Sequence, residues 1–132
     1  MNPQRLLSRY QESRILNASR EQLLLLTYDG LLRFLGRARR GIEAHDYEEK
    51  HVGFSRAEAI ILELHRTLDF SAASELAGNL ARIYSYLLEE LAHADSGDDE
   101  ARVQGVIEAV TELRNAWAEA AGRAAAGAQE GG

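Results

Sequence analysis

The sequence predicts an all-α protein, an antiparallel up-down four-helix bundle that follows a short N-terminal segment. Three observations support this fold class. Apolar residues recur in alternating steps of three and four through four long segments, which is the spacing of a helix face that packs in a bundle. No segment alternates apolar and polar residues with a period of two, so we expect essentially no sheet. The connections between the segments are short, and short connections make consecutive helices antiparallel neighbours.

The length of 132 residues fits one domain with one hydrophobic core. We divide the chain into an N-terminal cap segment, residues 1–18, a bundle domain, residues 19–123, and a tail, residues 124–132. The tail is rich in Ala and Gly and carries little that could pack, so we predict that it is disordered. Cysteine is absent, which excludes disulfides, zinc ribbons and thiol nucleophiles.

The first long helix begins near Ser19, which forms a capping-box pattern with Gln22. Leu23–Leu26 follow as four consecutive leucines, and successive residues of a helix point about 100° apart. A protein of this size is too small to surround a helix completely, so the surplus leucines predict a partner surface. The residues expected to face the core are Leu24, Tyr28, Leu31, Leu35, Ala38 and Ile42.

The second helix begins at a cap formed by Asp46 with Glu49, and the third follows a turn at residues 69–71. Ser71 or Ser74 is the predicted cap of the third helix. The expected core-facing residues of the second helix are Tyr47, His51, Phe54, Ala57, Ile61, Leu64 and Leu68. Those of the third helix are Leu76, Leu80, Ile83, Leu87 and Leu91.

The fourth helix follows an Asp-rich connection, residues 95–99. Gly97 is expected to end the third helix there in the left-handed conformation. The core-facing residues of the fourth helix repeat at heptad spacing and are Val103, Val106, Val110, Leu113, Trp117 and Ala120. With this helix the predicted bundle is complete.

The net charge of −6 is unevenly distributed. Residues 1–40 carry eight Arg against three acidic residues, whereas the remainder carries seven basic and eighteen acidic residues. Arg33, Arg37 and Arg40 share one helix face, but nucleic-acid-binding domains are usually basic overall, so we expect no nucleic-acid partner. The N-terminus lacks the apolar run of a signal peptide, and no stretch reaches the roughly 18 apolar residues needed to span a bilayer. We expect a cytosolic protein with no stable membrane insertion.

Two Glu-x-x-His pairs, Glu48 with His51 and Glu90 with His93, raise the alternative of a di-metal four-helix-bundle protein. Both pairs lie at helix ends, where water competes with protein ligands, and the motif is short. We therefore expect no metal site. A phosphate-binding Gly-rich loop and a nucleophile elbow are both absent from the sequence, so we expect no enzyme activity.

A set of short motifs spreads from about Leu7 to Glu119. They are Ala18-Ser19-x-Glu21-Gln22-Leu23, Tyr28-Asp29-Gly30 with Phe34-Leu35, Asp46, Leu68-Asp69, Glu75-Leu76-Ala77-x-Asn79-Leu80, Tyr84-x-Tyr86 and Leu113-Arg114-x-Ala116-Trp117. In their order and spacing these motifs resemble the FliS family of flagellar export chaperones. The chain departs from the family pattern at Arg20, where the family usually has Pro at the first helical position.

The resemblance implies a cytoplasmic chaperone that binds the disordered C-terminal part of flagellin, prevents its premature polymerisation and aids its delivery to the type III export apparatus. Client helices would lay their apolar faces into grooves between the helices of the bundle. The family's N-terminal segment carries an apolar-x-x-Tyr pattern, matched here by Leu7 and Tyr10. The resemblance implies that this segment covers part of the client site and contacts an export gate protein. It implies no cofactor.

The sequence offers apolar residues away from the core-facing stripes as candidates for the flagellin-binding surface. They are Leu25, Leu32, Ile60, Leu62 and Tyr86. Tyr28 and Asp29 are added from the family pattern, although Tyr28 also lies on a core-facing stripe, where its role would be structural. A generic helical dimerisation or adaptor module stays open as an alternative, because the surplus leucines could bury against a second copy. In that case the client-free protein would self-associate.

Overall fold

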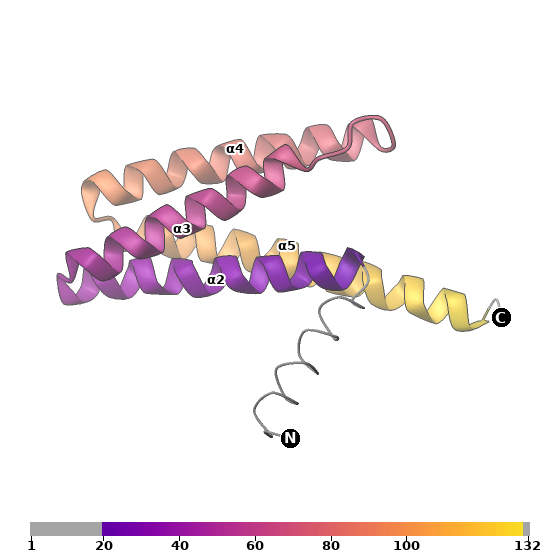
Figure 1. Cartoon of the computed structure of the whole chain (residues 1–132), viewed down its shortest axis with the longest axis horizontal. Coiled ribbons are helices and arrows are strands. Elements are labelled where there is room, and N and C mark those ends of the chain that lie inside the picture. The colour runs from indigo at the N-terminus through magenta and orange to yellow at the C-terminus, as the bar shows by residue number, and fades with distance from the viewer. Residues whose placement is uncertain (1–19, 131–132) are drawn as a thin grey trace, which may run out of the picture.

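The computed structural model describes the backbone of residues 20–130 and the side chains of residues 20–123. This part contains α2 Arg20–Ala44, α3 Tyr47–Arg66, α4 Ser74–Gly97 and α5 Glu100–Glu130, and no strand. Consecutive helices run in opposite directions (Figure 1). The main contacts join α2 to α3 and α5, and α4 to the same two helices. The predicted all-α, antiparallel four-helix bundle is confirmed. Within the described residues, none of the helices is both long enough and apolar enough to span a bilayer.

The predicted helix caps agree with the structure at α3 but not at α4. The carboxylate of Asp46 accepts a hydrogen bond of 3.1 Å from the backbone N–H of Glu49, as a capping residue should. The cap position of α4 is Ala73, whose side chain makes no capping hydrogen bond. The prediction that Ser71 or Ser74 caps this helix is therefore wrong. The predicted cap of α2, Ser19, lies outside the described residues.

The turn between α4 and α5 places a different residue in the left-handed conformation from the one expected. Asp98 has φ 47°, and its backbone N–H donates to the carbonyl of Ala94. Gly97 is still helical, so its prediction as the left-handed stop is wrong. Asp tolerates this conformation better than most residues, because its short polar side chain can hydrogen-bond locally.

The core follows the predicted stripes along the centre of the bundle. The exceptions are Tyr47 and His51 at the start of α3 and Leu76 at the start of α4, all of which are exposed. Each lies in the first two turns of its helix, at an end of the bundle where fewer neighbours surround it. The largest fully buried side chains are Tyr28, Leu31, Leu35, Phe54, Ile61, Leu87, Leu91, Val103 and Val110.

Two glycines bring α2 and α3 into close backbone contact. A Cβ added at Gly53 would lie 2.3 Å from the backbone nitrogen of Ala38, and one added at Gly41 would lie 2.3 Å from that of Lys50. No real Cβ occupies such positions, so only glycine permits this approach. We call this contact the glycine seam.

The last helix is the longest. It runs as far as Glu130 and includes residues 124–130. Four of these seven residues are Ala, the strongest helix former. At about 1.5 Å per residue the 31 residues of α5 extend over roughly 46 Å, and the helix continues past the first residue of α2 (Figure 1).

Candidate functional site

The leucine run lies at the start of α2 and is only partly covered by the bundle. Leu24 packs against the core, and Leu25 is half-buried. Leu23 is 40% exposed and Leu26 51% exposed. The apolar surplus that the sequence predicted therefore falls mainly on Leu23 and Leu26.

A cavity of about 450 Å³ opens beside the leucine run, where α3 turns into α4. Its edge carries the charged residues Arg20, Glu63 and Asp69. Hollows with apolar walls and a few polar groups are the usual form of a binding pocket. We call this one the leucine cavity, after its apolar wall of Leu23, Leu24, Leu64, Leu68, Leu80 and Trp117.

Three aromatic side chains from α2, α4 and α5 form a polar network at the leucine cavity: Tyr84 and Trp117 line the cavity, and Tyr28 is fully buried. The hydroxyl oxygens of Tyr28 and Tyr84 lie 2.6 Å apart and share a hydrogen bond. Trp117 Nε1 donates to the Tyr28 hydroxyl at 3.2 Å. Burial raises the pKa of both tyrosines, so both stay neutral near pH 7. A satisfied network of this kind fixes the three helices relative to one another.

A second hollow surface lies between α4 and α5. It consists of a cavity of about 320 Å³ and another of about 360 Å³, which share Tyr86 and Ala109. Tyr86 projects from α4 and is 58% exposed. We call this surface the α4–α5 groove; it is lined by Ile83, Tyr86, Leu87, Glu90, Arg102, Gly105, Val106, Ala109, Glu112, Leu113 and Ala116.

Comparison with known families identifies the family of this chain. The family described as flagellar protein FliS matches residues 3–124. The chain belongs to the FliS family. The flagellar secretion chaperone FliS of Bacillus subtilis is 32% identical over 111 residues, which cover 84% of this chain and 82% of the relative. That of Campylobacter jejuni is 34% identical over 101 residues, covering 76% and 79%, and that of Escherichia coli is 33% identical over 109 residues, covering 82% and 80%.

The family motif Tyr-Asp-Gly has a structural basis in this chain. Tyr28 is fully buried, so in this structure it supports the wall of the leucine cavity and offers no surface to a client. Asp29 accepts a hydrogen bond of 2.9 Å from Arg114 Nε and so joins α2 to α5. The family pattern thus marks two contacts that hold the helices together.

The remaining candidates for client contact differ in exposure. Leu62 of α3 is 57% exposed and, like Tyr86, is free to meet a partner. Leu32 and Ile60 are half-buried and pack against the core. Leu7 and Tyr10 lie outside the described residues. Three further large apolar residues are exposed: Leu26, which belongs to the leucine run; Leu76, which was expected to face the core; and Phe70 in the connection between α3 and α4, which helical periodicity does not cover.

The ligand set of the di-metal alternative is not assembled. Glu90 forms an ion pair of 2.9 Å with Arg102, and a hydrogen bond to Glu90 raises the pKa of Tyr86. Glu48, His51 and His93 are exposed. Across the part of the chain that the structure describes, no group of three or more His, Cys, Asp or Glu residues is placed to hold a metal ion.

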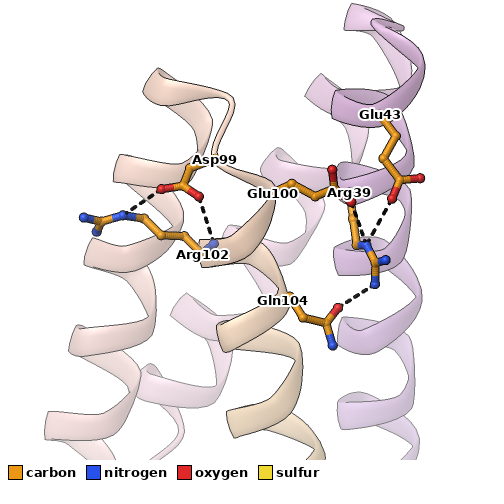
Figure 2. A network of polar contacts seen from close by, with 6 residues as sticks. All are labelled: Arg39, Glu43, Asp99, Glu100, Arg102 and Gln104. Carbon is orange, nitrogen blue, oxygen red and sulfur yellow. Dashed lines mark hydrogen bonds and ion pairs between the residues drawn. The ribbon is translucent and has the colours of Figure 1, made fainter.

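A polar network joins α2 and α5 at the opposite end of the bundle from the leucine cavity. Arg39 lies between Glu43 of its own helix and the first turns of α5, where it contacts Glu100 and Gln104 (Figure 2). A hydrogen bond between the two carboxyl groups lowers the pKa of Glu43 and raises that of Glu100. These side chains are well exposed, and exposed pairs stabilise a fold only slightly. We therefore expect the network to add only slightly to the stability of this end of the bundle.

Proposed function

We propose that this member of the FliS family is a cytoplasmic chaperone that binds the disordered C-terminal part of flagellin. It keeps the bound segment from polymerising early and delivers it to the type III export apparatus. It acts by binding, without catalysis and without a cofactor. The family membership and the chaperone relatives support this proposal.

The observation that carries the proposal is the amount of exposed apolar surface on a small bundle. Apolar patches of this kind mark interaction sites in soluble proteins. Two of the exposed side chains line the hollows described above: Leu23 lines the leucine cavity and Tyr86 lines the α4–α5 groove. The large apolar side chains that are more than a third exposed are Leu23, Leu26, Leu62, Phe70, Leu76 and Tyr86, together with Tyr47, which lies at the other end of the bundle from the leucine cavity and is not assigned to the client surface.

A disordered client suits such a dispersed surface. A segment that folds on binding loses conformational entropy, and this cost is offset only by burying a large area. Two separate hollows, the leucine cavity and the α4–α5 groove, allow one client chain to make contacts on several helices. Leu62 and Tyr86 are the candidates whose exposure fits direct contact.

The N-terminal segment is assigned a second role. The chain enters α2 at Arg20, which itself lines the leucine cavity. Residues 1–19 are therefore attached at the edge of an apolar hollow, which suits a cap that a client displaces. We propose that Leu7 and Tyr10 belong to this cap and to the contact with the export gate protein. Replacing both with Ala is expected to strengthen flagellin binding, because the cap no longer competes with the client, while lowering flagellin export.

Calorimetric titration tests the main proposal. The C-terminal segment of flagellin from the same bacterium is titrated into the full-length chain, and saturable one-to-one binding is expected. A control segment with its apolar residues replaced by Ser should not bind. At a ligand concentration of 100 Kd, binding should add about 2.7 kcal/mol to the free energy of unfolding. Absence of saturable binding by the natural segment would overturn the proposal.

A further inference from the structure

We infer that the α4–α5 groove binds one amphipathic helix of the client, which carries two apolar anchor residues seven positions apart and basic residues beside them. The inference rests on the proposed function and assigns one client helix to one groove. Three features of the groove support it: the spacing of its hollows, the open space over Gly105, and its charge.

The spacing of the two hollows matches two helical turns. Along α5, the first hollow centres on Gly105 and Val106, and the second on Glu112 and Leu113. Seven residues of a helix rise about 10.5 Å. A client helix lying along α5 would therefore present residues i and i+7 to the two hollows. Its residue i+3 or i+4 would lie over Ala109, which both hollows share.

Gly105, which has no side chain, lines the first hollow. A Cβ added there would meet no atom within 4 Å, so the space beside it is open. Val106 is buried and forms the apolar floor, while the Glu90–Arg102 ion pair closes one side. The hollow thus offers an apolar base and a polar edge, which is the environment of an anchor residue at an interface.

The charge of the groove indicates which helix fits. Of its three charged residues, Glu90 and Arg102 form an ion pair, so Glu112 leaves the groove with a net negative charge. Glu112 lines the second hollow and is itself exposed. Basic residues beside the anchors would complement this charge. A second copy that paired through the same groove would bring another Glu112 to it, so charge favours the client over that mode of self-association.

A glycine pair on one helix provides the test. Gly105 and Gly122 both lie on α5 with no atom within 4 Å of an added Cβ, but only Gly105 lines the groove. Gln is a good helix former, so Gly105→Gln and Gly122→Gln should both fold at least as well as the original chain. Affinity for the fluorescently labelled flagellin C-terminal segment is measured by anisotropy with the full-length chain. We expect at least tenfold weaker binding for Gly105→Gln and less than a twofold change for Gly122→Gln.

A charge pair provides a second, independent variant. Glu112→Lys reverses a charge inside the groove, and Glu108→Lys reverses an exposed charge on the same helix that lines neither hollow. We expect at least fivefold weaker binding for Glu112→Lys, and a larger loss at low salt than at high salt. Glu108→Lys should change the affinity less than twofold.

Each other outcome has a distinct meaning. If Gly105→Gln and Glu112→Lys bind like the original chain, or if each weakens binding no more than its control, the groove is not the client site, although the chaperone proposal stands. If Gly105→Gln instead converts a dimer of the free protein to monomers in sedimentation, a second copy occupies the groove and the inference is wrong. If the original chain does not bind the segment at all, the proposed function fails as well.

Discussion

Between α2 and α3, Gly41 and Gly53 lie directly against the backbone of the neighbouring helix, whereas Gly105 of α5 faces open space beside α4. At Gly41 and Gly53 the absence of a side chain lets α2 and α3 pack closely. At Gly105 it leaves open space beside α4. The α2–α3 pair packs most extensively and includes the glycine seam. The α4–α5 pair leaves a groove with an exposed Tyr86. The comparison indicates that the glycine seam is scaffold, whereas the α4–α5 groove is a binding face.

The largest expected change in the free energy of unfolding is at the glycine seam. Gly53→Ala places a methyl group 2.3 Å from the backbone nitrogen of Ala38, where no flexible side chain can give way. The helices must separate, so the free energy of unfolding should fall by about 3 kcal/mol, as in overpacked cores. Urea unfolding measures the loss. The control, Gly78→Ala on α4, meets only the end of Arg82 at 4.0 Å and should not be destabilised.

The buried tyrosine pair should give the next largest effect. Tyr84→Phe removes the hydroxyl that shares a hydrogen bond with Tyr28 and should lower the free energy of unfolding by about 1–2 kcal/mol. Tyr28→Phe should cost more, because it also removes the acceptor of the hydrogen bond from Trp117 Nε1. Because the two changes remove the same bond, the double variant should lose less than the sum of the single losses. Strict additivity in urea unfolding would show that the hydroxyls do not interact.

The same pair predicts a pH dependence. The pKa of each tyrosine is raised in the folded state from an ordinary value of 10.0, so the folded chain holds protons that the unfolded chain releases. This contribution to stability is complete below about pH 10 and is lost as the pH rises above it, by up to about 1.4 kcal/mol per pH unit for each tyrosine. Unfolding measured from pH 9 to 11 should therefore show a steeper decline for the original chain than for the double Phe variant. Equal slopes would show that Tyr28 and Tyr84 do not cause this loss of stability.

The smallest expected effect has the opposite sign from that at the glycine seam. Gly105→Ala adds a methyl group in open space and raises helix propensity, so it should raise the free energy of unfolding by about 0.5–1 kcal/mol. Gly122→Ala should give the same gain. A loss of stability at Gly105 would show that α4 and α5 approach each other more closely than the groove requires.

Much of the fold could be predicted because burial in a bundle follows helical periodicity. The stripe through Leu31 and Leu35 of α2 is buried as expected, and Asp46 caps α3 through the hydrogen bond that its position predicts. The family pattern likewise identified Tyr28 and Asp29, although their contacts turn out to be between helices.

What could not be predicted depends on neighbours that the sequence does not specify. Leu76 fits the α4 stripe but lies beyond the reach of the other helices, so it is exposed. Gly53 and Gly105 both interrupt an amphipathic helix in the same way. Only the packing of the bundle shows that one is pressed against a backbone and the other opens a groove. The candidate site depends on that distinction.

Photo-cross-linking from two exposed tyrosines shows whether the client lies in the α4–α5 groove. Tyr86 lies in the α4–α5 groove, and Tyr47 lies at the start of α3; the two are 58% and 69% exposed. Each is replaced in turn by p-benzoylphenylalanine, and the full-length chain is irradiated with the flagellin C-terminal segment. The account predicts a strong cross-link from position 86 and little from position 47. Equal yields, or a cross-link from position 47 alone, would contradict it.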